Sequence, residues 1–359
     1  MKPKIVTTGI CVAASAAITM TLTGVTAPAA PLAPDMGTKL AGKTIFLDPG
    51  HQGSNHTQEL SRQVSDGRGG TKDCQTTGMT TVNGVAEHTI NWKVSQLVKT
   101  ALESLGARVV LSRSDDSGWG GCIDERAQAA NESGAAVAVS IHADGSAAAH
   151  QGFHLIVPEL PVPDAAANIA QSTGGRAASE AVRDAYLAAG FPPANYAGVV
   201  NGLQTRSDIA GPALTRVPNV FVEMGNGANR EDAALLESPG GQLEHALAIT
   251  TGVVGYLLGV PPAVGSQATV SVGGSPASKP ANERPFRVDT DPDSLDLPGT
   301  TPRTTEPGSP TGSSSGIVAA VTKLLIPLAA ALGMDRTAIT TELINLAYTL
   351  AGILFAPTD

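Results

Sequence analysis

The sequence predicts an α/β fold, with one catalytic domain over residues 43–260 built on a mostly parallel, twisted sheet with helices on both faces. Two observations support this prediction. Short apolar runs typical of buried strands alternate along the chain with longer segments whose apolar residues recur at helical spacing. Such an alternation favours β-α-β units, in which each helix crosses over a face of the sheet.

The individual elements follow from apolar spacing and from the residues that end each segment. Asp48-Pro49-Gly50 ends the first strand, and Gly106 and Gly190 end the first and third helices. We expect strands at 44–47, 108–111, 136–141, 153–157 and 219–223, and helices at 87–105, 123–132, 165–189 and 242–258.

Composition excludes some classes of binding partner but does not identify the partner. The 359-residue chain has a net charge of −9 and no run rich in lysine and arginine. Binding to nucleic acid or to anionic lipid through bulk charge is therefore not expected.

The N-terminus has the pattern of a secretory signal. Lys2 and Lys4 precede an uncharged run over 5–25, and small residues follow at once. We interpret residues 1–30 as a signal peptide and 31–42 as a lead-in, which implies export to the periplasm or cell wall. The alternative is an uncleaved anchor, because 21 residues are enough to span a bilayer.

Composition changes after Val260. Residues 261–316 are rich in Pro, Gly, Ser and Thr, which predicts a disordered linker. Residues 317–355 hold two short apolar segments, which we interpret as a helical hairpin. This hairpin is either a simple structural element or a surface that docks on a membrane or a protein partner. We expect the protein to be a monomer.

Cysteine usage indicates a disulfide. Cys11 lies inside the signal segment, so the mature chain keeps Cys74 and Cys122. Two cysteines in an oxidising compartment favour one bond between them. Two unrelated buried thiols are the alternative. Neither cysteine has a C-x-x-C neighbour, so a cysteine-rich zinc site is not expected.

Polar residues follow three of the predicted strands, where a sheet of this class binds ligands. His51, His142 and Glu223 stand at or just beyond strand ends, and the carboxyl ends of parallel strands share one edge. Glu87 opens the helix after the first loop. Taken singly, each is an ordinary turn or helix-end residue. Together, two imidazoles and a carboxylate match the ligand set of catalytic zinc, and a second carboxylate can serve as general base. We therefore predict His51, Glu87 and His142 as ligands of Zn²⁺, and Glu223 as the base.

Four segments surround these residues. They are Ile45-Phe46-Leu47-Asp48-Pro49-Gly50-His51-Gln52-Gly53, Glu87-His88-Thr89-Ile90-Asn91, Val139-Ser140-Ile141-His142-Ala143-Asp144 and Pro218-Asn219-Val220-Phe221-Val222-Glu223-Met224-Gly225. Together they resemble the zinc-dependent N-acetylmuramoyl-L-alanine amidases of the third amidase class. The resemblance covers about residues 43–258 and is closest in character to mycobacterial and related actinobacterial members. It implies hydrolysis of the amide bond between N-acetylmuramic acid and the L-alanine of the stem peptide in peptidoglycan, with the first three segments holding zinc and the fourth supplying the catalytic Glu.

The sequence departs from the family after His51. Many members have Gly-x-Asp at this point, whereas this chain has Gln52-Gly53-Ser54-Asn55, so the loop differs. A Gly-rich, polar insertion over 55–85 separates two predicted ligands, and we expect it to form part of the rim or a lid.

Two further residues have weaker assignments. Arg126 is a candidate for binding a stem-peptide carboxylate, or for an ion pair with Asp124 or Glu125. Asp144 is a candidate for orienting His142. We expect His88 to point away from the site, and His56, His150, His154 and His245 to have ordinary structural roles.

Two rival functions stay open at this point. One is a zinc peptidase that cuts within the stem peptide. The other is a non-catalytic protein that binds the wall or activates another enzyme, although the intact set of His and Glu residues argues against it.

Overall fold

The computed structural model describes residues 36–260, 325–333 and 346, and its core is a six-stranded sheet with the strand order β4-β1-β5-β8-β6-β7. Neighbouring strands run parallel except β6 and β8, which are antiparallel. This confirms the predicted mostly parallel α/β fold. The strands are β1 (Thr44–Pro49), β4 (Arg108–Leu111), β5 (Val137–Asp144), β6 (His154–Pro158), β7 (Leu203–Arg206) and β8 (Asn219–Asn226).

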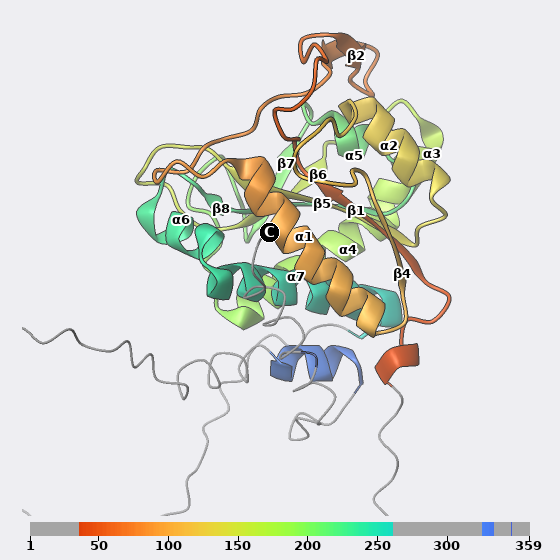
Figure 1. The fold of residues 1–359 in the computed structure, drawn as a ribbon. Helices are drawn as coiled ribbons and strands as arrows, with labels where there is room; N and C mark the ends of the chain where they lie inside the picture. The colour runs from red at the N-terminus through yellow and green to blue at the C-terminus, as the bar shows by residue number, and fades with distance from the viewer. Residues whose placement is uncertain (1–35, 261–324, 334–345, 347–359) are drawn as a thin grey trace, which may run out of the picture. The chain divides into compact units, whose positions relative to one another are not determined.

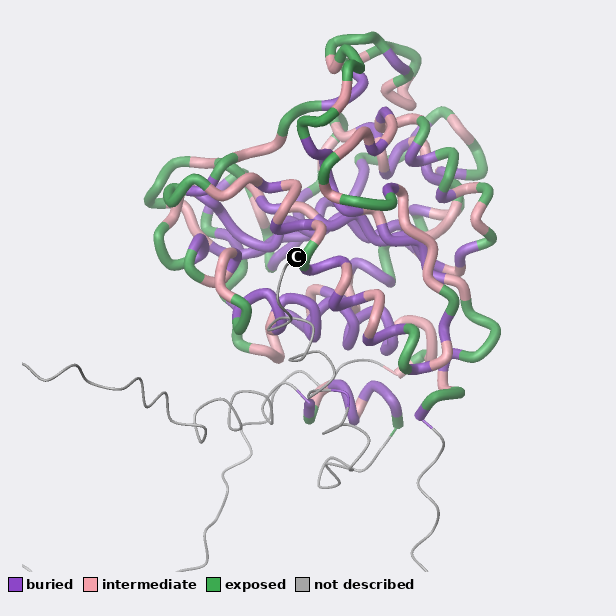
Figure 2. The backbone as a smooth tube through the Cα atoms, in the orientation of Figure 1, coloured by how far each residue is buried: buried purple, intermediate pink, exposed green. Residues whose placement is uncertain are grey.

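One face of the sheet is apolar and fully covered. Strand residues such as Leu47, Val139 and Val222 belong to a single hydrophobic cluster with three helices. These helices are α1 (Glu87–Ser104), α4 (Arg176–Ala189) and α7 (Pro239–Leu258). In Figure 1 α7 lies below the sheet and α1 runs obliquely in front of it, and Figure 2 shows the strands between the layers as buried.

The opposite face is built from smaller residues and carries the polar groups. Phe46 and Ala138 pack against Ala130 of α2 (Ile123–Glu132) in a separate small cluster. The short helix α5 (Ala210–Leu214) lies beside α2 on this face. Because side chains alternate along a strand, the polar Ser140 and His142 of β5 share this face with Ala138.

The predicted helix over 165–189 is divided into three parts. A π-helical turn (Gln171–Gly175) separates α3 (Ala165–Ala170) from α4. The side-chain amide nitrogen of Gln171 donates to the carbonyls of Thr215 and Val217, and its oxygen accepts from the backbone of Asn219. The turn therefore points Gln171 at the start of β8, a contact that helical spacing does not reveal.

Several short elements were absent from the prediction. They are η1 (Met36–Thr38), β2 (Gln63–Ser65), β3 (Thr71–Asp73), β7, α5 and α6 (Arg230–Glu237). β2 and β3 form an antiparallel hairpin inside the insertion over 55–85, and most of it is exposed (Figure 2). Each of these segments is too short to show a periodic apolar pattern.

A disulfide joins Cys74 to Cys122, with the two Cα atoms 4.6 Å apart, which confirms the predicted pairing. Cys74 follows β3 and Cys122 precedes α2, so the bond ties the exposed hairpin to the helix. Both cysteines are buried with Val64, and Trp119 and Ile123 pack against them.

The predicted signal peptide and linker lie outside the described residues, as does most of the C-terminal hairpin. Among its described residues, 325–333 and 346, the side chains of Leu325, Leu328 and Leu332 belong to the main hydrophobic cluster. Within the described ranges, every helix is too short or too polar to cross a membrane.

Candidate active site

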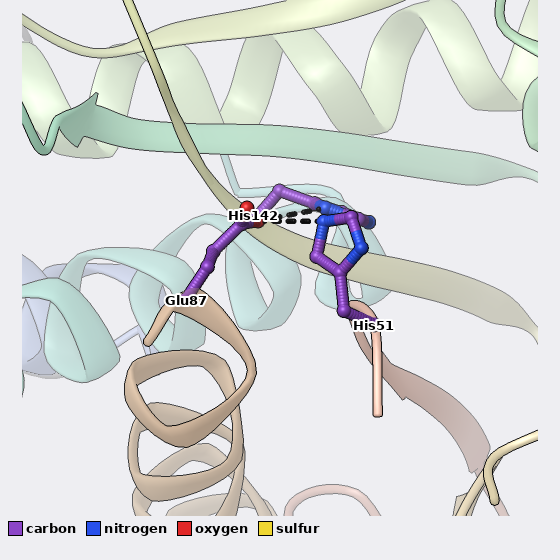
Figure 3. Close-up of side chains that lie close together, drawn as sticks. All are labelled: His51, Glu87 and His142. Atoms are coloured by element: carbon purple, nitrogen blue, oxygen red, sulfur yellow. Dashed lines mark hydrogen bonds and ion pairs between the residues drawn. The ribbon is translucent and has the colours of Figure 1, made fainter. Parts of the chain in front are cut away.

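His51, Glu87 and His142 come together at the carboxyl end of the sheet (Figure 3). The Oε1 atom of Glu87 lies 3.1 Å from Nε2 of His51 and 3.1 Å from Nδ1 of His142. The three possible ligand atoms all lie within 4.8 Å of one another. The predicted ligands therefore form one cluster, supplied by the end of β1, the start of α1 and the end of β5.

His51 has a constrained backbone and a fixed ring orientation. Its φ of 61° lies in the left-handed region, which residues other than glycine seldom adopt. Its Nδ1 lies 3.1 Å from the carbonyl oxygen of Thr76, which can only accept a hydrogen bond, so Nδ1 donates to Thr76 and Nε2 faces Glu87. Burial lowers the pKa of His51, but the charge of Glu87 and the hydrogen bonds to Glu87 and Thr76 outweigh burial and raise that pKa.

Glu87 is buried and held by hydrogen bonds at both carboxylate oxygens. Oε2 accepts from the backbone of Met79, and Oε1 accepts from the backbone of Ala143 and from the Asn91 side chain. Burial opposes ionisation, but the neighbouring His51 and hydrogen bonds from both imidazoles outweigh it and hold the pKa of Glu87 well below its usual range. The side chain is therefore a charged carboxylate near neutral pH.

His142 is fixed by stacking on Phe221, with ring centroids 4.4 Å apart and planes 9° apart. Burial lowers the pKa of His142, which keeps its imidazole neutral and able to ligate a metal.

Two glycines let the backbone approach these ligands. A Cβ atom on Gly50 would overlap the His142 ring. Gly78 has a φ of +76°, and a Cβ atom there would lie 2.7 Å from Oε2 of Glu87 and 2.8 Å from the His51 ring. The sequence pattern indicated Gly50 as part of a turn but offered no sign that Gly78 touches the site.

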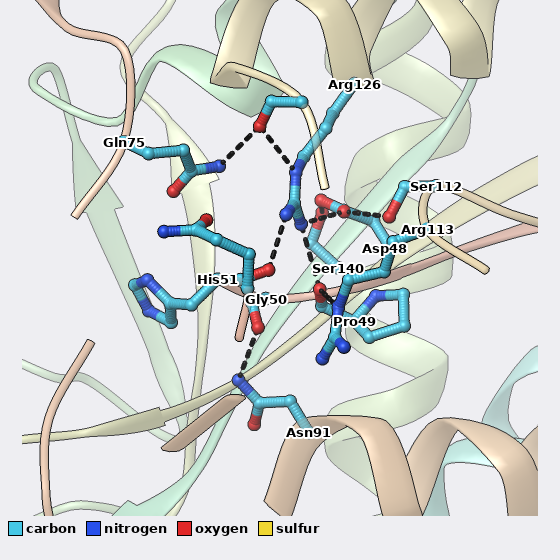
Figure 4. A network of polar contacts seen from close by, with 12 residues as sticks. Asp48, Pro49, Gly50, His51, Gln75, Asn91, Ser112, Arg113, Arg126 and Ser140 are labelled. Atoms are coloured by element: carbon cyan, nitrogen blue, oxygen red, sulfur yellow. Dashed lines mark hydrogen bonds and ion pairs between the residues drawn. The ribbon is translucent and has the colours of Figure 1, made fainter. Parts of the chain in front are cut away.

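Buried donors bind the carbonyl groups around His51 (Figure 4). The Pro49 carbonyl accepts from Arg113 and Arg126, the Gly50 carbonyl from Asn91, and the His51 carbonyl from Arg126. This network holds the strained turn that carries His51. Arg113 and Asn91 were not among the predicted site residues.

The structure corrects the predicted ion pair of Arg126. Its ion-pair partner is Asp48, at 2.8 Å, and not Asp124 or Glu125. Four of its five N–H groups are used within the protein, on Asp48 and on the carbonyls of Pro49, His51 and Gly121. Arg126 is therefore a positioning residue for the His51 turn. It also lines the cavity of the site, and its contact with a stem-peptide carboxylate stays a prediction.

Glu223 lies beside the ligand cluster but is not part of it. It is paired with His142 in the register of β5 and β8, and its side chain is buried. Burial and the charges of Glu87 and Asp144 raise the pKa of Glu223 well above its ordinary value. A cavity of about 430 Å³ is lined by Glu223 and by all three members of the cluster.

Three other predictions need comment. The carboxylate that contacts His142 is Glu87; Asp144 instead lies near Tyr196 and Glu223 and raises the pKa of both. His88 points away as expected, with its Nδ1 2.8 Å from Asp116. His154, for which we expected an ordinary structural role, is buried opposite Glu223 in the pairing of β6 and β8.

The site combines two imidazoles and a carboxylate with a second carboxylate beside them at the strand ends. This combination is typical of metal-dependent hydrolases. The sequence profile of the N-acetylmuramoyl-L-alanine amidase family matches residues 45–254, more than half of the chain, and the chain belongs to this family.

Individual relatives agree with this assignment. The N-acetylmuramoyl-L-alanine amidase Rv3717 of Mycobacterium tuberculosis is 42% identical over 218 residues, which are 61% of this chain and 88% of that protein. The crystal structure of the amidase Ami1 from Mycobacterium smegmatis is 44% identical and covers 61% of this chain and 98% of its own, with a TM-score of 0.57. The apo form of Ami1 from Mycobacterium abscessus also has a TM-score of 0.57, at 42% identity over 61% of this chain and 100% of its own.

Proposed function

We propose that this chain hydrolyses the amide bond between N-acetylmuramic acid and the L-alanine of the stem peptide, with zinc held by His51, Glu87 and His142 and with Glu223 as general base. The single observation that carries this mechanism is the separate carboxylate of Glu223, which lines the same cavity as the three ligand residues.

The donor set fits zinc. It consists of two imidazole nitrogens and one carboxylate oxygen, the set that leaves a fourth position open in catalytic zinc sites. Glu87 is already a charged carboxylate, and the hydrogen bond from Nδ1 of His51 to Thr76 leaves Nε2 as the nitrogen that would face a metal. When bound there, zinc would supply a Lewis acid for the scissile carbonyl and lower the pKa of water.

Glu223 is suited to moving the proton. A carboxylate with a raised pKa accepts a proton from water and holds it long enough to return it to the leaving amine. The leaving group in this reaction is the amino group of L-alanine, so one carboxyl can serve first as base and then as acid.

The test combines metal analysis with product analysis. Protein of measured metal content is incubated with muropeptides, and the products are identified by mass spectrometry. We expect one zinc per chain and release of an intact peptide with L-alanine at its N-terminus. Products cut inside the stem peptide would indicate a zinc peptidase instead, and binding without any product would indicate a wall-binding protein.

Two variants separate the proposed roles. Glu223→Gln keeps the shape of the side chain but removes the base, so zinc should stay while turnover falls by about 10² or more. His142→Ala should lose both zinc and turnover. Near-normal turnover in Glu223→Gln would place the proton acceptor elsewhere, and full zinc occupancy in His142→Ala would overturn the ligand assignment.

We also propose that the protein is exported and acts as a monomer in the periplasm or cell wall. Its substrate lies there, and the Cys74–Cys122 disulfide suits an oxidising compartment. N-terminal sequencing of the mature protein would test cleavage of the signal segment near residue 30. Detection of the uncleaved chain in the cytoplasm alone would contradict export.

A further inference from the structure

Two buried polar atoms on paired residues lack a hydrogen-bond partner among the described residues. They are Nδ1 of His154 and Oε2 of Glu223. The two residues lie directly opposite each other in the antiparallel pairing of β6 and β8. Side chains of such a pair leave the same face of the sheet, with Cβ atoms about 4.5–5.5 Å apart. Buried polar atoms in native proteins nearly always have a partner, so this coincidence requires an explanation.

The two atoms are chemically complementary. His154 is only 1% exposed, and burial lowers its pKa to about 4, so its imidazole is neutral near pH 7 and carries one N–H. The carboxylate of Glu223 can only accept hydrogen bonds while it is charged. The imidazole is held in place by its neighbours, because the Tyr196 ring packs at right angles to it at 5.7 Å and Gln204 of β7 lies beside it.

We propose that His154 is a positioning residue for Glu223, with its Nδ1–H donating a hydrogen bond to Oε2 of Glu223 during the reaction. This inference rests on the proposed role of Glu223 as base. The bond would occupy one carboxylate oxygen and direct the other, Oε1, toward the cavity. A proton taken from water would then go to Oε1 and pass from it to the leaving amine, while Oε2 continues to accept from His154.

The geometry distinguishes this role from direct catalysis. His154 is not a member of the metal-type cluster formed by the described residues, and it does not line the cavity beside that cluster. It therefore reaches neither the metal site nor the substrate, and it acts through Glu223. Removing it should change the rate constant more than substrate or metal binding.

Three variants test the proposal. His154→Leu removes both ring nitrogens. His154→Asn restores an amide N–H at the position of the imidazole Nδ1, since both nitrogens are bonded to Cγ. The matched control is His245→Leu, which removes another imidazole that is 1% exposed but lies in α7, within the cluster on the opposite face, against Tyr186. For each variant, kcat and KM on a soluble muropeptide, zinc per chain and the Tm are measured.

We expect His154→Leu to lower kcat by about 10- to 100-fold, the effect of losing one hydrogen bond to a charged group, with KM and zinc content little changed. His154→Asn should recover most of that loss. His245→Leu should lower the Tm and leave kcat close to the wild-type value.

Three results would overturn the inference: a wild-type kcat in His154→Leu, an equal loss of kcat in His245→Leu, or a fall in zinc content that accounts for the loss. Glu223→Gln, measured in parallel, separates the two proposals. If that variant is active, the proposed function itself fails. If it is inactive and His154→Leu is not, only the role of His154 fails.

Discussion

At the scale of single residues, the ligand cluster depends on side chains that do not face the metal site. These side chains donate hydrogen bonds to the backbone carbonyls of the turn that carries His51. His51 sits in a left-handed conformation that its own side chain does not favour, and the carbonyls beside it are held by Arg113, Arg126 and Asn91. Burial opposes the charge on Asp48, but Arg126, the hydrogen bond from Ser112 and the charge of His142 together outweigh burial and lower the pKa of Asp48. The ion pair of Arg126 and the partly buried Asp48 is therefore part of the support for the ligand turn.

Arg126→Ala should destabilise the protein and weaken zinc binding. It would leave the partly buried Asp48 without its ion-pair partner, a change that costs about 3–5 kcal/mol where the pair is fully buried, and would release two carbonyls of the His51 turn. Urea unfolding and a competitive zinc titration measure the two effects. Arg216→Ala is the control, because Arg216 forms an exposed pair with Asp164 that should contribute at most about 1 kcal/mol. Equal effects in the two variants would contradict the supporting role of Arg126.

At the scale of elements, the insertion between the first two ligands is a hairpin tied to α2 by the disulfide. The same helix supplies Arg126, which holds the turn at His51. The disulfide therefore connects the exposed hairpin of β2 and β3 to the helix that supports this turn. Neither sulfur is a member of the metal-type cluster.

Replacing both Cys74 and Cys122 by serine should lower stability more than activity. The two residues are 48 positions apart, and closing a loop of this length stabilises a protein by about 4 kcal/mol in the chain-entropy model. Denaturant unfolding of the wild type and the double variant, each with its kcat, measures this. Thiol labelling of the denatured, unreduced wild type should detect neither cysteine, and two labelled thiols would contradict the bond.

At the scale of the whole molecule, two neutral histidines are buried in different parts of the domain. Burial lowers the pKa of His245 to about 3 and that of His154 to about 4, from an ordinary value of 6.5. Between the lowered pKa values of the folded protein and the ordinary value of 6.5, the unfolded chain binds more protons than the folded protein. The free energy of unfolding therefore increases with pH over this range.

The free energy of unfolding should accordingly fall as the pH is lowered from about 6.5 toward 3. Urea unfolding at several pH values, in the presence of a chelator to remove the effect of metal binding, measures the slope. His245→Leu should flatten it, because that variant has one group fewer to protonate on unfolding. A slope unchanged by the substitution would mean that His245 does not contribute to the acid sensitivity.

A chain ending at Pro261 should fold, bind zinc and hydrolyse a soluble muropeptide at close to the full-length rate, because every proposed active residue precedes that point. Its Tm should be lower, since Leu325, Leu328 and Leu332 belong to the main hydrophobic cluster. Comparing both chains on soluble muropeptide and on intact wall would show whether residues 317–355 affect location. Loss of activity on the small substrate would place the tail within the catalytic fold.

The fold class and the central residues of the site could be predicted because they depend on local patterns and one topological rule. Apolar spacing identified the long helices and five of the six strands of the main sheet. Parallel strands place their carboxyl ends at one edge, and this rule alone predicts that His51, His142 and Glu223 lie together.

The sequence alone therefore determined the α/β class, the His/Glu/His cluster and the separate Glu223, since each follows from periodicity and strand order. Only the tertiary structure decided that Arg126 pairs with Asp48, that Gly78 touches two ligands and that His154 lies opposite Glu223. The physical reason is that these contacts join residues from segments far apart in the chain. Such segments are short or irregular, or their pairing is not encoded locally, so the sequence shows no apolar periodicity that would predict the contact. Their roles come from burial and from partners that are fixed only when the whole sheet has formed.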